Sequence, residues 1–406
     1  MTATAARSVR GLAAKAAPVL SQGITAGTSL VLQILAARAL GLAEFGAFAL
    51  LLALLVTASG LYTGGVGDAL AVLDRHDPAT RAGIAASALG CWALCLAVAV
   101  GTALVVAEGE PWVAAAFAAM VVLRLAAETA RRLLMARLEF WRLVVNDTAH
   151  LVVTLVAVGI FAATGRITLL GLLASMAMGA GAAVLTGILQ LPADELRRVR
   201  PGRAALAQVL SFAAWRSLQA ALRPAALLAS RVLVSAFLSL AAVGALEAGR
   251  LVVAPLQVVI NGAGGFLLSD FAARERQSAA RAHGRASRAA KILLLGTGIG
   301  GISLALLSNP LGRLLTGSEV DPLLVLGWVA YLMSWAAGLP HVTEAVARRK
   351  AREVFLIRLV DSLLGLALVA AALLWWDGVA VVPWLMACGG AYSSWRVRRL
   401  AIRSRA

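Results

Sequence analysis

The chain has 406 residues, of which 61% are hydrophobic and only 14% charged, and its formal net charge is +17. A soluble domain has about 45–50% apolar and about 25% charged residues, so this composition excludes a water-soluble protein. The mean hydropathy of +0.87 instead predicts a protein embedded in lipid. Because no long polar block interrupts the apolar segments, we expect no attached soluble domain.

Twelve apolar segments are long enough to cross a bilayer, for which a helix needs about 20 residues. In chain order they cover residues 16–37, 45–66, 83–107, 112–130, 143–164, 167–190, 208–236, 243–267, 292–309, 322–345, 354–376 and 379–395. Membrane β-barrels are built from alternating segments of about 10 residues, and these segments are too long and too continuously apolar for that. We therefore expect an all-α, polytopic membrane protein with about twelve transmembrane helices.

A short sequence occurs twice, as LGLAEFGA at residues 40–47 and as LSLAAVGA at residues 238–245. The same offset of 198 residues brings Gly64 onto Gly262 and Gly67 onto Gly265. Each copy falls in a short turn between two apolar segments. A repeat at half the chain length predicts two similar six-helix lobes, residues 1–200 and 201–406, and in membrane proteins such repeats are typical of transporters.

Basic residues are distributed unevenly between the two sides of the predicted bundle. The two termini and the loops after every second segment hold 28, whereas the opposite loops hold four, namely Arg38, Arg166, Arg250 and Arg313. By the positive-inside rule the first side is cytoplasmic, and both termini lie there. Both copies of the repeat then fall on the outer side, as expected for parallel repeats about an axis along the membrane normal. Loops that fix topology and contact anionic lipid explain the positive charge, so we expect no nucleic-acid partner.

Three stretches resemble the polysaccharide-transporter branch of the multidrug/oligosaccharidyl-lipid/polysaccharide exporter superfamily, which contains the flippases of O-antigen, capsule and exopolysaccharide units. They are ARALGLAEFGAFAL (residues 37–50), GLYTGGVGDALAV (residues 60–72) and LEAGRLVVAPLQVVINGAGGFLLSDFAARE (residues 246–275). The resemblance also covers the number and order of the helices. It implies a V-shaped pair of six-helix lobes around a central cavity that opens alternately to each side.

The resemblance also implies a cargo, which is an oligosaccharide on a polyprenyl pyrophosphate. This cargo would move from the inner to the outer leaflet of a bacterial cytoplasmic membrane. The expected partners are the lipid-linked glycan and membrane lipid, with a polymerase or another glycan-assembly protein as a further candidate. Lipid II flippases usually carry two helices more than this chain, so a different lipid-linked glycan is favoured.

Arginines inside the apolar segments are the candidate substrate-binding residues. Arg216, Arg223 and Arg231 are 7 and 8 residues apart, which places them on one stripe of the segment 208–236. Pro224 is expected to kink this helix. A guanidinium carries permanent positive charge and suits a pyrophosphate or an acidic sugar. In the alternative interpretation, Arg216 and Arg231 extend to opposite membrane interfaces.

Arg124 is the fourth candidate, and it precedes Glu128 by four residues in the segment 112–130. This spacing permits an intrahelical ion pair, which is the alternative to a cavity-facing Arg124. Glu247 and Arg250 are expected to pair locally in the same way, and Glu344 is expected to lie at the membrane interface.

The sequence predicts no catalytic centre, metal site or cofactor. Cys91 and Cys95 are interpreted as packing residues, and the four histidines occupy separate loops and helix ends, His76, His150, His283 and His341. No lysine stands in the Gly-Lys-Ser/Thr context of an ATP-binding loop. A polytopic glycan-processing enzyme is disfavoured because the outer loops are very short. A drug or cation exporter of the same superfamily is disfavoured because arginine exceeds carboxylate inside the segments.

Overall fold

The computed structural model describes residues 2–165, 167–196, 200–273, 279–348, 350–376 and 378–403. Within these ranges every regular element is a helix, so the all-α prediction is confirmed. Several arginines of the predicted loops lie outside the described residues, namely Arg166, Arg197, Arg198, Arg274, Arg276, Arg349 and Arg405.

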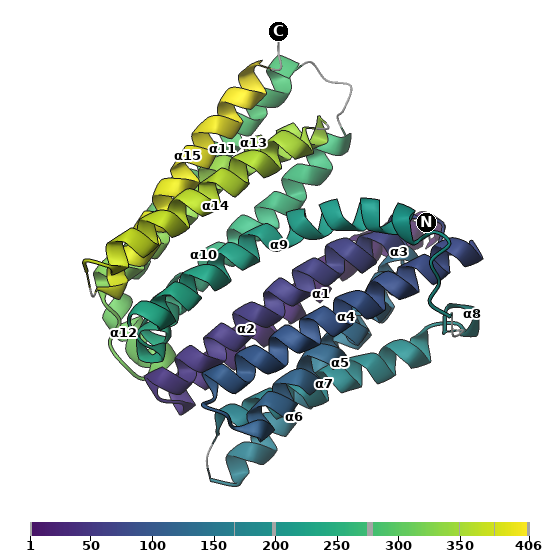
Figure 1. The fold of residues 1–406 in the computed structure, drawn as a ribbon. Helices are drawn as coiled ribbons and strands as arrows, with labels where there is room; N and C mark the ends of the chain where they lie inside the picture. The colour runs from purple at the N-terminus through teal and green to yellow at the C-terminus, as the bar shows by residue number, and fades with distance from the viewer. Residues whose placement is uncertain are drawn as a thin grey trace. The chain divides into compact units, whose positions relative to one another are not determined.

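Each predicted segment corresponds to one long helix (Figure 1). The first six are α1 (Thr2–Ala39), α2 (Leu42–Tyr62), α4 (Pro78–Val106), α5 (Pro111–Ala136), α6 (Phe140–Ala163) and α7 (Leu169–Gln190). The second six are α9 (Leu206–Phe237), α10 (Leu240–Ala273), α11 (Ala279–Leu306), α13 (Pro322–Ala347), α14 (Ala351–Leu373) and α15 (Val382–Arg403). The short elements are η1 (Thr63–Gly67), α3 (Asp68–Val72), α8 (Ala193–Leu196), α12 (Ser308–Thr316) and η2 (Val379–Val381).

Eleven of the described helices are long and apolar enough to cross a membrane. The most apolar stretch of α2 is 67% buried inside the protein, but those of α4 and α11 are only 17% buried. Exposed leucines and valines on such helices are suited to contact lipid. The remaining long helix, α15, ends in arginines and packs against α13 and α14.

Capping residues define where several helices begin. Asp77 caps α4, where it accepts hydrogen bonds from the Thr80 backbone N–H (2.8 Å) and hydroxyl (2.7 Å), and Pro78 occupies the first turn. The Thr80 hydrogen bonds hold the pKa of the Asp77 carboxyl below its ordinary value. Asp321 and Thr168 cap α13 and α7 in the same way.

The described chain forms two compact units, the first comprising residues 1–40 and 51–225 and the second residues 41–50 and 226–406. In the first, α7 packs against α5 and α6, and α4 packs against α5. In the second, α15 packs against α13 and α14, and α11 packs against α13. The sixth helix of each set thus contacts the fourth and fifth, and the third contacts the fourth. This recurrence supports two similar sets of six helices, while the lobe boundary at residue 200 stays a prediction.

The two copies of the sequence repeat begin α2 and α10, each after a short turn, and they contact each other within the second unit. A Cβ on Gly46 would lie 1.8 Å from the Leu240 carbonyl oxygen, and a Cβ on Gly244 would lie 2.1 Å from the Leu42 carbonyl oxygen. Leu240 and Gly244 are the repeat equivalents of Leu42 and Gly46, so the contact is reciprocal. Only glycine permits this approach of two backbones, as in other membrane helix pairs with small residues at the interface.

Candidate functional site

The glycine-rich end of α2 forms a π-helical turn, η1, whose glycines are buried. A Cβ on Gly64 would lie 2.3 Å from the Arg216 carbonyl oxygen of α9, and one on Gly65 would lie 2.6 Å from the Ser217 hydroxyl. Ser217 also donates a hydrogen bond of 2.9 Å to the Leu61 carbonyl. The glycines therefore let α9 approach this turn closely. π-Helical turns inside α-helices occur frequently at functional sites.

The repeat equivalent of this turn in the second unit is packed differently. A Cβ on Gly262, which corresponds to Gly64, would meet open space, because no atom of the described residues lies within 4 Å of that position. Gly64 therefore allows close approach of a neighbouring helix, whereas its repeat equivalent Gly262 has no such contact among the described residues.

Arg216 enters an ion-pair network at this turn. Its guanidinium lies 2.5 Å from the Asp68 carboxylate at the start of α3. The other oxygen of Asp68 lies 3.6 Å from Arg132 of α5. Arg132 in turn donates a hydrogen bond of 2.8 Å to Glu128, and its stem crosses Gly67, where a Cβ would lie 2.9 Å away. The turn thus positions two arginines around one carboxylate.

The network continues into the interior of the first unit. Arg131 lies 3.8 Å from Glu128 and donates hydrogen bonds of 2.5 and 2.7 Å to Asp147 of α6. Asp147 also accepts a 2.5 Å hydrogen bond from Ser21 of α1. The Arg131 and Asp147 side chains are 9% and 8% exposed, whereas the Arg216 side chain is 47% exposed. Three arginines and three carboxylates thus alternate from an exposed end to a buried end.

The predicted segment 112–130 is too short at its end, because Arg131 and Arg132 lie within α5 and not in the loop that follows it. The helix continues past the predicted end at residue 130 to Ala136. Glu128 stands three and four residues before the two arginines, so their charges are balanced on the same helix and can be partly buried. This spacing was the signal in the sequence that could have identified them.

The other predicted site residues of the first unit lie near the network. Arg124 is half-buried on α5, one turn before Glu128, and its charge acts on that carboxylate. The oxygens of Glu128 contact Arg131 and Arg132, so the close ion pairs described for this carboxylate are with those two residues. Arg223 is half-buried on α9, close to two turns after Arg216.

Arg231 belongs to a separate ion pair in the second unit. It donates a hydrogen bond of 2.7 Å to Glu247 of α10, and its side chain is only 6% exposed. Glu247 also accepts a hydrogen bond of 2.6 Å from Arg250, which agrees with the predicted local pair. A role of Arg231 in binding cargo would require this pair to open.

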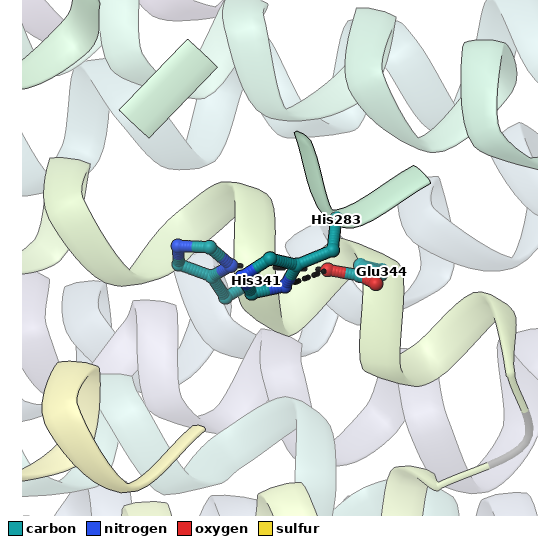
Figure 2. Close-up of side chains that lie close together, drawn as sticks. All are labelled: His283, His341 and Glu344. Carbon is teal, nitrogen blue, oxygen red and sulfur yellow. Dashed lines mark hydrogen bonds and ion pairs between the residues drawn. The ribbon is translucent and has the colours of Figure 1, made fainter. Parts of the chain in front are cut away.

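A third cluster joins His283 at the beginning of α11 to His341 and Glu344 near the end of α13 (Figure 2). The expectation that the histidines are scattered was wrong for this pair, whose ring centroids are 5.1 Å apart. Glu344 is buried inside the protein, with 1% exposure, and its position at the membrane interface stays a prediction. Of the described residues, these three form the group that could hold a metal ion. The i,i+3 spacing of His341 and Glu344 was the available signal, but His283 is 61 residues from Glu344.

Three solved structures are similar to the chain over almost its full length. An inward-facing multidrug resistance MATE family transporter of the MOP superfamily has a TM-score of 0.72 and 13% identity, with 96% of this chain and 99% of that chain covered. The lipid II flippase MurJ, in an inward closed conformation, has a TM-score of 0.75 and 11% identity, with coverage of 97% and 87%. A MOP superfamily transporter from Pyrococcus furiosus has a TM-score of 0.62 and 13% identity, with coverage of 97% and 96%.

The chain has the fold of these MOP-superfamily transporters. The predicted fold class is thereby confirmed, including the number and order of about twelve helices. No protein-family model matches the sequence, and no curated protein matches it either. At 11–14% identity the similarity establishes the fold alone.

Proposed function

We propose that the chain is a flippase that moves a polyprenyl-pyrophosphate-linked oligosaccharide from the cytoplasmic to the outer leaflet by alternating access. The observation that carries the proposal is the nearly half-exposed guanidinium of Arg216, at the exposed end of the arginine–carboxylate network that begins at the glycine-rich turn. Three arginines and three carboxylates make up this network, Arg131, Arg132 and Arg216 with Asp68, Glu128 and Asp147.

A diphosphate diester carries one negative charge on each phosphate and is a ligand for guanidinium groups. Charged groups inside a membrane protein are costly unless they are paired or face water or a ligand. The network residues meet this requirement by pairing with one another, and Arg216 at the exposed end keeps contact with its surroundings. Guanidinium groups bind phosphate oxygens with two hydrogen bonds each, so an exposed arginine suits a pyrophosphate headgroup.

Arg216 is the network arginine best placed to meet a headgroup, because nearly half of its side chain is exposed. Asp68 fixes the guanidinium from one side, which leaves further N–H donors for a second anion. Arg223 follows about two turns later on the same helix face. We therefore propose Arg216 and Arg223 as headgroup contacts, with Arg124 as a third contact. Arg231, in the second unit, is proposed separately as a cargo contact that forms only when its pair with Glu247 opens.

The same charge pattern argues against a drug or cation exporter. Such a protein would need carboxylates available for a cation inside the helices. Asp68, Glu128 and Asp147 each bond at least one arginine, so their charges are already balanced.

The proposal includes a bacterial cytoplasmic membrane as location and a cytoplasmic position for both termini, supported by the distribution of arginine in the loops. Single cysteines at two exposed positions, Arg352→Cys and Ser318→Cys, would be introduced into a variant without native cysteines. A membrane-impermeant reagent should label position 318 from outside intact cells and position 352 only after lysis. Labelling of position 352 in intact cells would reverse the proposed orientation.

The cargo is tested by replacing the chromosomal gene with variants and analysing lipid-linked and surface glycans. Arg216→Ala should abolish surface glycan and trap its lipid-linked precursor in the inner leaflet, while protein abundance stays unchanged. Arg216→Lys should restore part of the export, because the charge remains but the two-pronged hydrogen bonding is lost. Arg313→Ala is the matched control, since Arg313 is also an exposed arginine paired with a carboxylate, Glu319, but lies in a different region of the chain.

Normal surface glycan in the Arg216→Ala strain would contradict the headgroup role. Normal lipid-linked glycans after deletion of the gene, together with increased sensitivity to cationic drugs, would instead support the exporter alternative.

A further inference from the structure

The cluster of His283, His341 and Glu344 is separate from the arginine network and from the proposed transport of a glycan. Its residues come from two helices of the second unit that pack along each other, α11 and α13. All three side chains are buried, with exposed fractions of 6%, 3% and 1%. Figure 2 shows both imidazole rings beside the same carboxylate.

The donor atoms are close enough to share one ion. The His283 Nδ1 lies 3.3 Å and the His341 Nδ1 lies 3.8 Å from the Glu344 Oε2 atom. One donor atom from each residue fits within a group no wider than 4.8 Å. Zinc lies about 2.0–2.2 Å from imidazole nitrogen and carboxylate oxygen, so two donors on one ion are about 3–4 Å apart. The side chains would need only small movements to reach this spacing.

One of the donor atoms has unmet hydrogen-bonding capacity. The His341 Nδ1 atom is buried and has no hydrogen-bond partner in the described part of the chain. Buried polar atoms are usually satisfied, because burial without a partner is costly. A cation between the three residues would satisfy this imidazole nitrogen and contact the carboxylate oxygen that faces it.

Arg348 completes the surroundings of the carboxylate. Its guanidinium forms an ion pair of 3.2 Å with the Glu344 Oε1 atom, one turn further along α13, whereas both imidazoles face Oε2. Arg348 therefore balances and orients the carboxylate from the side away from the histidines. Groups of this kind beside a metal ligand fix its orientation.

We propose that His283, His341 and Glu344 form a binding site for a divalent transition-metal ion that bridges α11 and α13. Two imidazoles and one carboxylate are donors suited to zinc and its neighbours in the first transition row, whereas magnesium and calcium prefer oxygen donors alone. Three protein ligands leave at least one coordination position for water. The bound ion ties the beginning of α11 to the end of α13, next to the arginine-rich segments predicted to be cytoplasmic.

The alternative occupant is a proton, which would turn one imidazole into a cation that donates a hydrogen bond to Glu344. Both occupants contact the carboxylate, but only a metal ion needs both histidines as ligands. The two are therefore distinguished by direct metal binding and by its dependence on each residue.

The test uses the full chain, purified in detergent with a tag that contains no histidine and stripped of metal with a chelator. After incubation with Zn²⁺ or Co²⁺ and removal of unbound ion, we expect about one bound ion per chain by elemental analysis. Co²⁺ should give a visible absorption band, and Zn²⁺ should raise the midpoint of thermal unfolding. Mg²⁺ should do neither.

Each ligand is then replaced in turn, as His283→Ala, His341→Ala and Glu344→Gln. Loss of a group that only supports a metal ligand typically weakens binding by about 10–100-fold. Loss of a ligand itself should weaken Zn²⁺ binding by more than this. His76→Ala is the matched control, since His76 is an exposed histidine, and it should bind as the unchanged chain does. Monodisperse elution and unchanged helicity confirm folding, and His341→Gln serves as a milder substitution if His341→Ala fails this check.

Two results would overturn the proposal. The first is the absence of stoichiometric Zn²⁺ and Co²⁺ from the unchanged chain. The second is binding that persists in all three ligand variants. Neither result bears on the export of glycan, so the metal site and the proposed transport function fail or hold separately.

Discussion

Substitution of Gly46 by alanine tests the contact between the two copies of the repeat. The added Cβ would lie 1.8 Å from the Leu240 carbonyl oxygen. Close carbon–oxygen contacts settle at about 3.3–3.6 Å, so the two helix ends must separate by about 1.5 Å. Overpacking of this kind costs about 1–3 kcal/mol, and the higher helix propensity of alanine offsets up to about 1 kcal/mol. We expect a net loss of about 2 kcal/mol.

The loss of stability is measured as a fall in the midpoint of thermal unfolding of the purified protein. The midpoint is determined from the amount of protein that stays monodisperse after heating. Gly41→Ala is the matched control, because Gly41 lies in the turn just before α2 and a Cβ there would meet no atom of the described residues within 4 Å. Its stability should stay within about 0.5 kcal/mol of the unchanged chain.

The reciprocal geometry gives a second, sharper expectation. Gly244→Ala should destabilise the protein to a similar degree, since its Cβ would lie 2.1 Å from the Leu42 carbonyl oxygen. Combined with Gly46→Ala, it should cost less than the sum of the two, because the first substitution has already separated the helices. Full stability of Gly46→Ala, or strict additivity of the pair, would refute a shared close contact.

Three further predictions concern charged residues. Glu247→Gln leaves Arg231 buried without a carboxylate, so unfolding should become easier by about 3 kcal/mol, measured by thermal denaturation in detergent. The pKa of Asp77 is lower in the folded chain than in the unfolded chain, where it is about 3.9. The stabilisation from this cap is therefore complete above about pH 3.9 and is lost as the pH falls through the folded-state pKa. Thr80→Val should weaken this pH dependence in the hydrogen exchange of the first turn of α4. Asp68→Asn should cost less than about 1 kcal/mol of stability, since its arginine partner on α9 is half exposed, but should reduce glycan export.

Each of these has its own control. Glu44→Gln, at an exposed glutamate, should leave stability unchanged, and equal stability of Glu247→Gln would contradict the buried pair. Hydrogen exchange in the first turn of α4 is compared between the unchanged chain and Thr80→Val. If the two proteins exchange equally at every pH, the role of Asp77 is contradicted. If Asp68→Asn exports glycan normally, the orientation of Arg216 by Asp68 has no part in transport.

The sequence predicts the helices well because the signal for a membrane span is local. Each span is a continuous apolar run of about 20 residues, so composition alone reveals it. The repeat likewise predicted similar helix sets, and the recurring pairs of packed helices agree with it. Helix ends were less predictable: α5 continues through Arg131 and Arg132, because neighbours in space balance their charges.

The candidate site was predictable only in part. Arg216 was identified from its position inside an apolar segment, but Asp68, its partner 148 residues away, was not. His283 and Glu344 are 61 residues apart, and neither stands in a recognisable metal-binding motif. Ion pairs and ligand sets of this kind depend on which helices pack together.

The amino-acid sequence by itself determined a lipid-embedded bundle of about twelve helices, built from two similar sets and rich in arginine. Hydrophobicity and short-range periodicity are properties of each segment, so they need no knowledge of its neighbours. Only the tertiary structure decided which arginines are neutralised, which glycines admit a neighbouring backbone and which histidines meet a carboxylate. These outcomes depend on distances of a few ångströms between segments far apart in the chain, and helix packing alone sets those distances.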